Sequence, residues 1–332
     1  MTSLPLGSPA LEAALTPRLE LVEERLRDAV AQSDKLADAS SRHLVDAGGK
    51  RLRPMLVLLC AQLGDGARPE VLDAAVVVEL THLATLYHDD VMDSAPTRRG
   101  APSAHEVWGN SVAILTGDLL FARASTVVAG LGPQAVRIQA ETFERLCIGQ
   151  LHETVGPDDA DDPVDFYLQV LADKTASLIA TSARFGAMFG GCPRSIVEQV
   201  TRYGEFAGVA FQLADDVIDI RSDAATTGKT PGTDLREGVP TMPVLLLRRR
   251  VAAPDATDED RDLLAAIDGD LSDDAALASV VARLAVHPVL DETAELARKW
   301  AYQAVGAIAS LPEGDVKDSL GAFAEALVAR AA

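Results

Sequence analysis

Two acidic motifs, Asp89-Asp90-Val91-Met92-Asp93 and Asp215-Asp216-Val217-Ile218-Asp219, share the pattern DDxxD, and each lies within an apolar run. On an α-helix, the first and last aspartates of such a motif lie about one turn apart on the same face. Carboxylates this close inside a protein disfavour one another's charge unless a cation neutralises them. Mg²⁺ suits such sites, because it binds one or two protein carboxylates and takes its other ligands from water and substrate phosphate. The motifs therefore predict one diphosphate held between two helices.

Basic residues that suit a phosphate group accompany both motifs. The segment Gly48-Gly49-Lys50-Arg51-Leu52-Arg53 has two glycines that free the backbone and three cations, and arginine can bind phosphate oxygens in pairs. Lys174 is a candidate for a second clamp, and the loop 228–235, which contains Lys229, could close over a diphosphate. The alternative is that these residues form a solvated turn and a plain connector.

His82 lies seven residues before Asp89, about two helical turns, and so points in the same direction. The surrounding Leu80, Leu83 and Leu86 make this helix too apolar for a solvated acidic face. We therefore interpret His82 as part of the same site, although a hydrogen-bonded core histidine is the alternative. For Gln150-Leu151-His152-Glu153, a helix surface is as good an interpretation as a site.

The composition favours a helical globule. Hydrophobic residues make up 48% of the 332 residues and aromatic residues only 4%, with many alanines and leucines. The net charge of −20 argues against nucleic acid and against a polybasic membrane attachment. The three cysteines form no CxxC pair, which gives no indication of zinc or disulfides. Without a leader or an 18-residue apolar stretch, we expect a cytoplasmic protein with at most peripheral membrane contact.

Helical periodicity covers most of the chain, and alternation typical of strands is lacking. Thr16 and Pro17 predict a cap and first turn, and Pro54 can open another helix. Further helices are expected over 71–93, 111–129, 134–153, 164–186, 194–220 and 241–251, followed by several shorter ones. No linker separates them. We therefore expect one all-α domain over residues 1–332, with residues 1–10 disordered.

The motifs together resemble those of the trans-polyprenyl diphosphate synthase family of isoprenoid synthases, and particularly its actinobacterial long-chain members. The resemblance covers about residues 48–243. It rests on GGKRLRP, HDDVMD with RRG, GQ, KT, and FQLADDVID with GKTPGTDL, in this order. It implies an all-α, single-domain isoprenoid synthase bundle of about ten or more helices around a central cavity.

The resemblance also implies a role for each matching residue. The diphosphate of isopentenyl diphosphate would be bound by Lys50, Arg53, His82 and Arg99. About three Mg²⁺ ions, for which Mn²⁺ is a substitute, would be bound by Asp89, Asp90, Asp93, Asp215, Asp216 and Asp219. These ions would hold an allylic diphosphate with help from Arg98, Lys174, Gln212 and Lys229, while Thr175 faces the developing cation. Asp89, Asp90, Lys174 and Asp215 would be the catalytic residues.

The sequence departs from the family pattern at Val239, where a lysine is common. A third cation over the leaving group is then missing, or Arg236 supplies it.

The implied reaction starts when metal ions and cationic side chains stabilise the departing diphosphate of geranyl, farnesyl or geranylgeranyl diphosphate. The double bond of isopentenyl diphosphate attacks the allylic cation head-to-tail, and a proton is then lost, with the released diphosphate as its acceptor. Repetition gives an all-trans polyprenyl diphosphate.

Product length depends on the residues that precede Asp89. In the family, a bulky aromatic residue four or five positions earlier limits growth. Here these positions are Thr85 and Ala84, with Thr81 a further turn away. The small side chains imply a long product, about C35–C50, for a quinone such as menaquinone. The alternative is a C15–C20 product, if Phe143, Leu146 or Tyr87 closes the tunnel.

Other functions fit the sequence less well. A terpene cyclase usually carries a different second motif, and a regulatory subunit usually lacks aspartates that are present here. An acidic cation-binding protein is supported by the net charge alone. The family resemblance further implies a homodimer.

Overall fold

The computed structural model describes residues 7–221 and 231–329, and the elements in these ranges are helices apart from one small sheet. The all-α class is therefore confirmed. The chain divides into two compact units. Unit 1 contains Met1–Leu146, Ser177–Glu205 and Gly306–Phe323, and unit 2 contains Cys147–Ala176, Phe206–Val305 and Ala324–Ala332. The expected single domain stays a prediction.

Unit 1 begins with α1 (Pro9–Val30) and α2 (Lys35–Asp46), capped by the side chains of Ser8 and Asp34. The predicted cap at Thr16 is wrong, because Pro17 lies inside α1 and the Thr16 hydroxyl donates to the carbonyl of Glu12. Ser8 followed by Pro9 provides both the cap and a first-turn proline. Helix α1 thus includes Pro9 and Ala10 of the segment 1–10, while residues 1–6 lie outside the described ranges, and the expected disorder of this segment stays a prediction.

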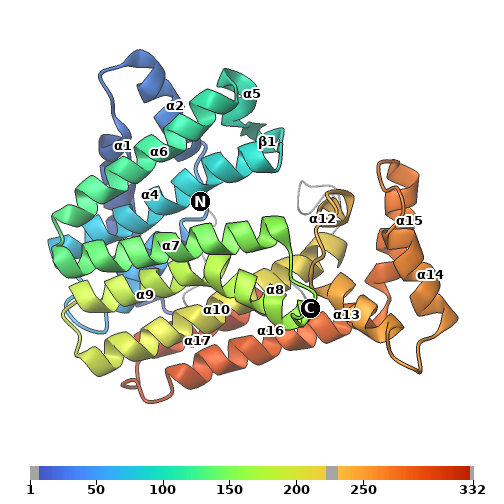
Figure 1. Cartoon of the computed structure of the whole chain (residues 1–332). Helices are drawn as coiled ribbons and strands as arrows, with labels where there is room; N and C mark the ends of the chain where they lie inside the picture. Colours follow the sequence, from blue (N-terminus) through green and yellow to red (C-terminus); the bar gives the residue numbers. More distant parts are fainter. Residues whose placement is uncertain (1–6, 222–230, 330–332) are drawn as a thin grey trace. The chain divides into compact units, whose positions relative to one another are not determined.

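The core of unit 1 is built on α3 (Leu52–Ala61) and α4 (Pro69–Met92). Helix α4 packs against α3, α6 (Asn110–Ala129) and α9 (Ser177–Phe189), as Figure 1 shows for α4 and α6. Both α3 and α4 are apolar on nearly all sides, which is typical of a helix with neighbours all round. The first acidic motif lies at the C-terminal end of α4, where the helix dipole disfavours negative charge. A ligand-binding role explains such a placement better than stability does.

A short hairpin follows the first motif. Strands β1 (Thr97–Arg98) and β2 (Ala101–Pro102) pair antiparallel, and α5 (Ala104–Trp108) comes next. Arg99 and Gly100 form the turn at φ 55° and 79°. Positive φ at both central residues is typical of tight hairpin turns. The sequence predicted no strand here, because a two-residue strand has no periodicity to detect.

The predicted helix over 164–186 is instead three segments. They are α8 (Pro163–Leu171), a π-helical turn η1 (Ala172–Ala176) and α9. Gly149 of α7 (Pro133–Val155) permits close packing against this turn, because a Cβ at position 149 would lie only 2.5 Å from the backbone nitrogen of Lys174. Single π-helical turns occur frequently at functional sites. The turn contains both Lys174 and Thr175.

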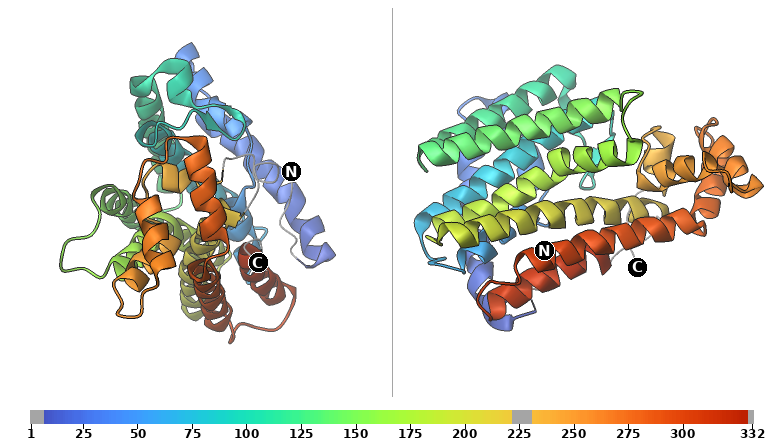
Figure 2. Two further views of the ribbon diagram at one scale, coloured as in Figure 1. Left: turned by 90° about the vertical axis from the view of Figure 1, so that its right-hand side faces the viewer. Right: turned by 60° about the horizontal axis from the view of Figure 1, so that its bottom comes forward.

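Unit 2 has its core around the second half of α10 (Arg194–Arg221), with Leu213, Val217 and Met242 among its buried residues. It continues with α12 (Thr233–Arg236), α13 (Met242–Val251), α14 (Asp258–Ile267) and α15 (Asp274–Ala285). Figure 2 shows the short helices α14 and α15, in orange, next to one another. The chain ends with α16 (Pro288–Ala307) and α17 (Asp315–Ala329), and both helices contribute to both units.

Helix α6 is long and apolar enough to cross a membrane, with a mean hydropathy of 1.5. One such helix is weak evidence for a membrane protein, since a core helix of a soluble protein meets the same criterion.

Candidate active site

The middle aspartate of the first motif is fully buried in unit 1. Oδ1 of Asp90 accepts a hydrogen bond from Nε of Arg98 at 2.6 Å and forms an ion pair with Nη2 of the same guanidinium, also at 2.6 Å. The other oxygen, Oδ2, is buried and has no hydrogen-bond partner within residues 7–221 and 231–329. Burial raises the pKa of Asp90, and Arg98 opposes this shift. Asp89 is half-buried and Asp93 is exposed at the end of α4.

Three of the predicted ligands of the isopentenyl diphosphate group, His82, Arg53 and Arg99, lie near one another in unit 1. The pKa of His82 lies well below its ordinary range, first because of burial and then because of the nearby charges of Arg53 and Arg99. Both effects favour the neutral imidazole of His82 over the cation. Burial likewise lowers the pKa of Arg53, and its buried Nε has no acceptor in the described part of the chain. An anion would satisfy this donor and offset the like charges.

The glycine-rich segment shapes this site. Gly48 and Gly49 have φ values of 80° and 148°. Nη1 of Arg99 donates to the carbonyl of Leu44 at 3.0 Å and also to that of Gly48. A Cβ on Gly49 would lie only 2.9 Å from Cζ of Arg99, so a side chain at this position would displace the arginine.

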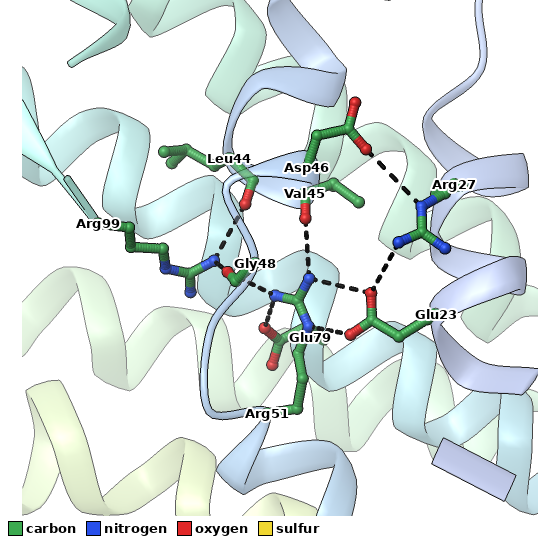
Figure 3. Close-up of polar contacts among 9 residues, drawn as sticks. All are labelled: Glu23, Arg27, Leu44, Val45, Asp46, Gly48, Arg51, Glu79 and Arg99. Atoms are coloured by element: carbon green, nitrogen blue, oxygen red, sulfur yellow. Dashed lines mark hydrogen bonds and ion pairs between the residues drawn. The ribbon is translucent and has the colours of Figure 1, made fainter. Parts of the chain in front are cut away.

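The three cations of this segment do not act alike. Lys50 is exposed, Arg53 is half-buried, and Arg51 is buried in ion pairs with Glu23 and Glu79 (Figure 3). The prediction that all three form a diphosphate clamp is therefore wrong for Arg51. Its burial depends on two carboxylates that are distant in sequence.

The second motif, in unit 2, has a matching arrangement. Asp216 is only 2% exposed, and its Oδ2 accepts from the Tyr167 hydroxyl at 2.9 Å and from the Met242 amide at 3.3 Å. Its Oδ1 is buried and lacks a hydrogen-bond partner in the described ranges. Burial raises the pKa of Asp216 to about 8, and the charge of Asp234 adds to the shift. In both motifs, the protein thus holds one oxygen of the middle aspartate, while the other has no donor among the described residues.

Three further predicted site residues of unit 2, Lys174, Thr175 and Gln212, also have polar contacts. Lys174 pairs with Glu153, and the Thr175 hydroxyl donates to Oε1 of Gln212 at 3.3 Å. Glu153, for which the sequence left a plain helix surface open, therefore has a contact with a predicted site residue. Lys229 lies outside the described residues.

The acidic residues fit divalent cations that are completed by substrate. Within residues 7–221 and 231–329, no three His, Cys, Asp or Glu side chains come together as a ready-made metal site. Mg²⁺ does not need one, because it is commonly held by one or two carboxylates and by substrate phosphates. Oδ2 of Asp90 and Oδ1 of Asp216 are buried acceptors that a cation would satisfy. The roles of the six aspartates as ligands remain predictions.

Near Val239, the structure bears on the possible replacement cation. Arg236 is exposed and pairs with Asp274 at 2.5 Å. The amide of Val239 donates to the carbonyl of Asp234 at 2.9 Å. Arg236 is thus engaged by α15 in this structure, and its substitution for the missing lysine stays a prediction.

The residues predicted to set product length lie on the buried part of α4. Thr81 and Ala84 are buried and Thr85 is half-buried. Both threonine hydroxyls donate to carbonyls of their own helix, those of Val77 and His82.

Two of the residues that could close a tunnel have identified partners in unit 1. The Tyr87 hydroxyl donates to the carbonyl of Ser40 in α2, which makes Tyr87 a link between helices. The Phe143 ring packs against Phe121 with ring centroids 3.7 Å apart.

Sequence reasoning missed Tyr167 and Arg51. Tyr167 lies in the short apolar helix α8, and neither its type nor its spacing indicates a partner on α10. Arg51 was grouped with its basic neighbours, because only the fold brings Glu23 and Glu79 to it.

Helices that carry acidic motifs beside basic side chains define the class of all-α isoprenoid synthases. The family model of polyprenyl synthetases matches residues 34–284. A nonaprenyl diphosphate synthase of Mycobacterium tuberculosis is 43% identical over 98% of this chain and 96% of its own length. Component 2 of the heptaprenyl diphosphate synthase of Geobacillus stearothermophilus is 35% identical over 94% and 95% of the two chains.

A crystal structure of the geranylgeranyl pyrophosphate synthase of Corynebacterium glutamicum, complexed with calcium and isoprenyl diphosphate, superposes with a TM-score of 0.86. It is 40% identical and covers 98% of both chains. The present chain belongs to the polyprenyl synthetase family and is a trans-prenyltransferase.

Proposed function

We propose that this enzyme joins isopentenyl diphosphate head-to-tail to an allylic diphosphate and repeats the step to give a long all-trans product, about C35–C50. Similarity alone does not select the length, since a nonaprenyl and a geranylgeranyl enzyme are 43% and 40% identical to the chain. The observation that carries the proposal is the pair of small residues Ala84 and Thr85 before Asp89.

In the proposed reaction, Arg53 and Arg99 bind the diphosphate of isopentenyl diphosphate, and exposed Lys50 adds its charge from the glycine-rich segment. Arg53 supplies its buried Nε donor. His82 serves as a hydrogen-bond donor, and its lowered pKa favours the uncharged form. These contacts fix the second substrate while its double bond attacks the allylic carbon.

The allylic diphosphate is bound by Arg98, Lys174 and Gln212, with Lys229 as a further cation in the proposed site. The aspartates of the two motifs would hold Mg²⁺, which supplies Lewis-acid stabilisation of the leaving diphosphate. Arg98 orients Asp90, and Tyr167 orients Asp216, through the hydrogen bonds described above. Thr175 faces the developing cation.

The test is product sizing. Purified enzyme is incubated with farnesyl diphosphate, radiolabelled isopentenyl diphosphate and Mg²⁺, and the products are separated by chain length. We expect products of about seven to ten isoprene units. Termination at C15 or C20 would contradict the long-chain proposal and would favour the closure of the tunnel by groups such as the Phe121 and Phe143 rings.

We further propose a cytoplasmic homodimer that supplies a quinone pathway such as that of menaquinone. The exposed apolar side chains of α6 support dimerisation, since Ile114 is 43% and Leu115 is 65% exposed. Sedimentation of the pure protein tests this, and a monomer would contradict it. One relative is named as component 2 of a heptaprenyl diphosphate synthase. The measured mass is therefore also compared with that expected for an assembly of two different proteins.

A further inference from the structure

The backbone segment that carries Lys50 is fixed by a buried guanidinium. Arg51 is only 3% exposed. Its Nε and Nη2 donate to the two carboxylate oxygens of Glu23 on α1, and its Nη1 donates to Glu79 on α4 at 2.8 Å (Figure 3). One side chain thus connects two helices that enclose the segment.

The same guanidinium holds the end of α2. Nη2 of Arg51 donates to the carbonyl of Val45 at 3.0 Å, and Nη1 donates to the carbonyl of Gly48 at 3.3 Å. The backbone of Arg51 is left-handed, at φ 49°, where it precedes the first residue of α3. A non-glycine residue in this region is strained and persists only where its surroundings hold it.

Arg51 and Arg99, a residue predicted to bind substrate, donate to the same carbonyl oxygen. The Gly48 carbonyl accepts from Nη1 of Arg51 and also from Nη1 of Arg99. Whatever fixes this carbonyl therefore also fixes Arg99. Arg27 supports the arrangement from outside, with ion pairs to Glu23 at 3.8 Å and to Asp46 at 3.7 Å.

The arrangement is a poor device for stability alone. A buried arginine between two carboxylates is often no more stabilising than apolar residues of similar volume, and fixing one specific geometry is a better-supported use of such groups. The fork of donors of an arginine can hold two carboxylates and two carbonyls at once, which a lysine cannot do.

We propose that Arg51 is a positioning residue, which holds the Gly48 carbonyl and the following turn so that Lys50, Arg53 and Arg99 are in place for a diphosphate. The identification of this ligand as isopentenyl diphosphate rests on the function proposed above. Arg51 itself does not contact the ligand.

The test measures binding rather than turnover. Isothermal titration gives the Kd of isopentenyl diphosphate for the wild type, for Arg51→Lys and for the control Arg25→Lys. Arg25 also joins α1 to α4, through Asp73, but both side chains are about 40% exposed and lie outside the contacts of the glycine-rich segment. We expect Arg51→Lys to weaken binding about tenfold or more, as for the loss of a residue that supports a ligand. The control should bind as the wild type does.

A triple variant separates positioning from the effect of uncompensated charge. Glu23→Gln, Arg51→Met and Glu79→Gln together remove all three charges at similar volume, and circular dichroism and thermal unfolding verify its fold. If Arg51 positions the segment, this folded variant still binds weakly, because the donors to Val45 and Gly48 are gone. Wild-type affinity in the folded triple variant, or equal weakening in Arg25→Lys, would overturn the inference.

Steady-state kinetics add a second measurement. We expect Arg51→Lys to raise the KM for isopentenyl diphosphate and leave the KM for the allylic substrate nearly unchanged. Equal changes in both would also contradict positioning. If the wild type binds isopentenyl diphosphate without forming product, then the proposed function fails while the binding comparison still tests Arg51.

Discussion

Tyr167 donates its hydroxyl hydrogen to Asp216 at 2.9 Å, and this bond joins α8 to the buried face of α10 in unit 2. Asp90 in unit 1 is held in the corresponding way by Arg98. One middle aspartate is thus oriented by a neutral phenol and the other by a cation. The two motifs thus have the same sequence pattern but different electrostatic surroundings. Asp216, which has no cation bonded to it in the described residues, binds a proton more readily than Asp90 does.

The first prediction concerns this hydrogen bond. Tyr167→Phe keeps the ring and removes the donor, so Asp216 is less well oriented, and we expect the Mg²⁺ concentration for half-maximal activity to rise about tenfold. Tyr203→Phe is the matched control, because it removes a buried hydroxyl that donates to the Leu320 carbonyl at 2.7 Å in unit 1. An equal change in both variants would show a general effect on stability instead.

Second, removing the leading aspartate of either motif should nearly abolish turnover. We expect Asp89→Ala and Asp215→Ala to lower kcat by about three orders of magnitude or more, because charge stabilisation supplies much of the rate enhancement. Asp258→Ala, at a fully solvated position of α14, serves as the control. Initial rates at saturating substrate give the comparison, and a loss below tenfold at either motif would refute its catalytic role.

Third, a bulky side chain at Thr85 should shorten the product. Thr85 is half-buried, whereas Ala84 is fully buried, so Thr85→Phe strains the core less than Ala84→Phe does. We expect Thr85→Phe to shift products toward C15–C20, with Thr85→Val as the isosteric control. Chromatographic sizing measures the shift, and an unchanged product distribution would show that this part of α4 does not limit chain growth.

Fourth, the metal-free protein should lose stability as the pH rises toward 8. The folded pKa of Asp216, about 8, lies above that of an unfolded aspartate, about 3.9. Between these values, the folded state binds more protons than the unfolded state, so stability falls with increasing pH.

Urea unfolding in EDTA from pH 5 to 8 measures this slope. Asp216→Asn should reduce the dependence of the free energy of unfolding on pH. Added Mg²⁺ should stabilise the wild type most near pH 8. A stability that does not vary with pH in this range would argue against a protonated Asp216.

Fifth, Asp260 should have the opposite pH dependence. Hydrogen bonds from Thr257, followed by that from His287, lower the pKa of this carboxylate in the capping box of α14. Its contribution is therefore present at neutral pH and is lost as the pH falls through the folded pKa. We expect Asp260→Asn to lower the free energy of unfolding by about 1 kcal/mol at pH 7.

The difference in the free energy of unfolding between Asp260→Asn and the wild type should be smaller near pH 3 than at pH 7. Denaturant titrations at these two pH values measure it. If the free-energy difference is the same at both pH values, then the loss of stability in Asp260→Asn comes from packing and not from the charge of Asp260.

Much of the helical architecture is predictable from local pattern. The expected segments 111–129 and 194–220 agree with α6 and α10 to within a residue at each end, because long apolar periodicity with polar interruptions specifies a helix. Predictions fail where two local signals compete, as for the cap at Thr16 instead of Ser8. The π-helical turn at Lys174 has no local signal in the sequence, and the tertiary structure brings Gly149 close to it.

The sequence by itself determined the chemistry: two aspartate motifs and the basic residues near them indicate a diphosphate, because residue type and spacing suffice to place carboxylates on one helix face. Only the tertiary structure decided which of these side chains are charged or engaged. The pKa of His82 is lowered first by burial and then by arginines that other elements bring close to it. Unlike its neighbours Lys50 and Arg53, Arg51 is buried and connects two helices, because Glu23 on α1 and Glu79 on α4 form ion pairs with it. Burial and partner distance arise from packing, and a local sequence pattern does not contain them.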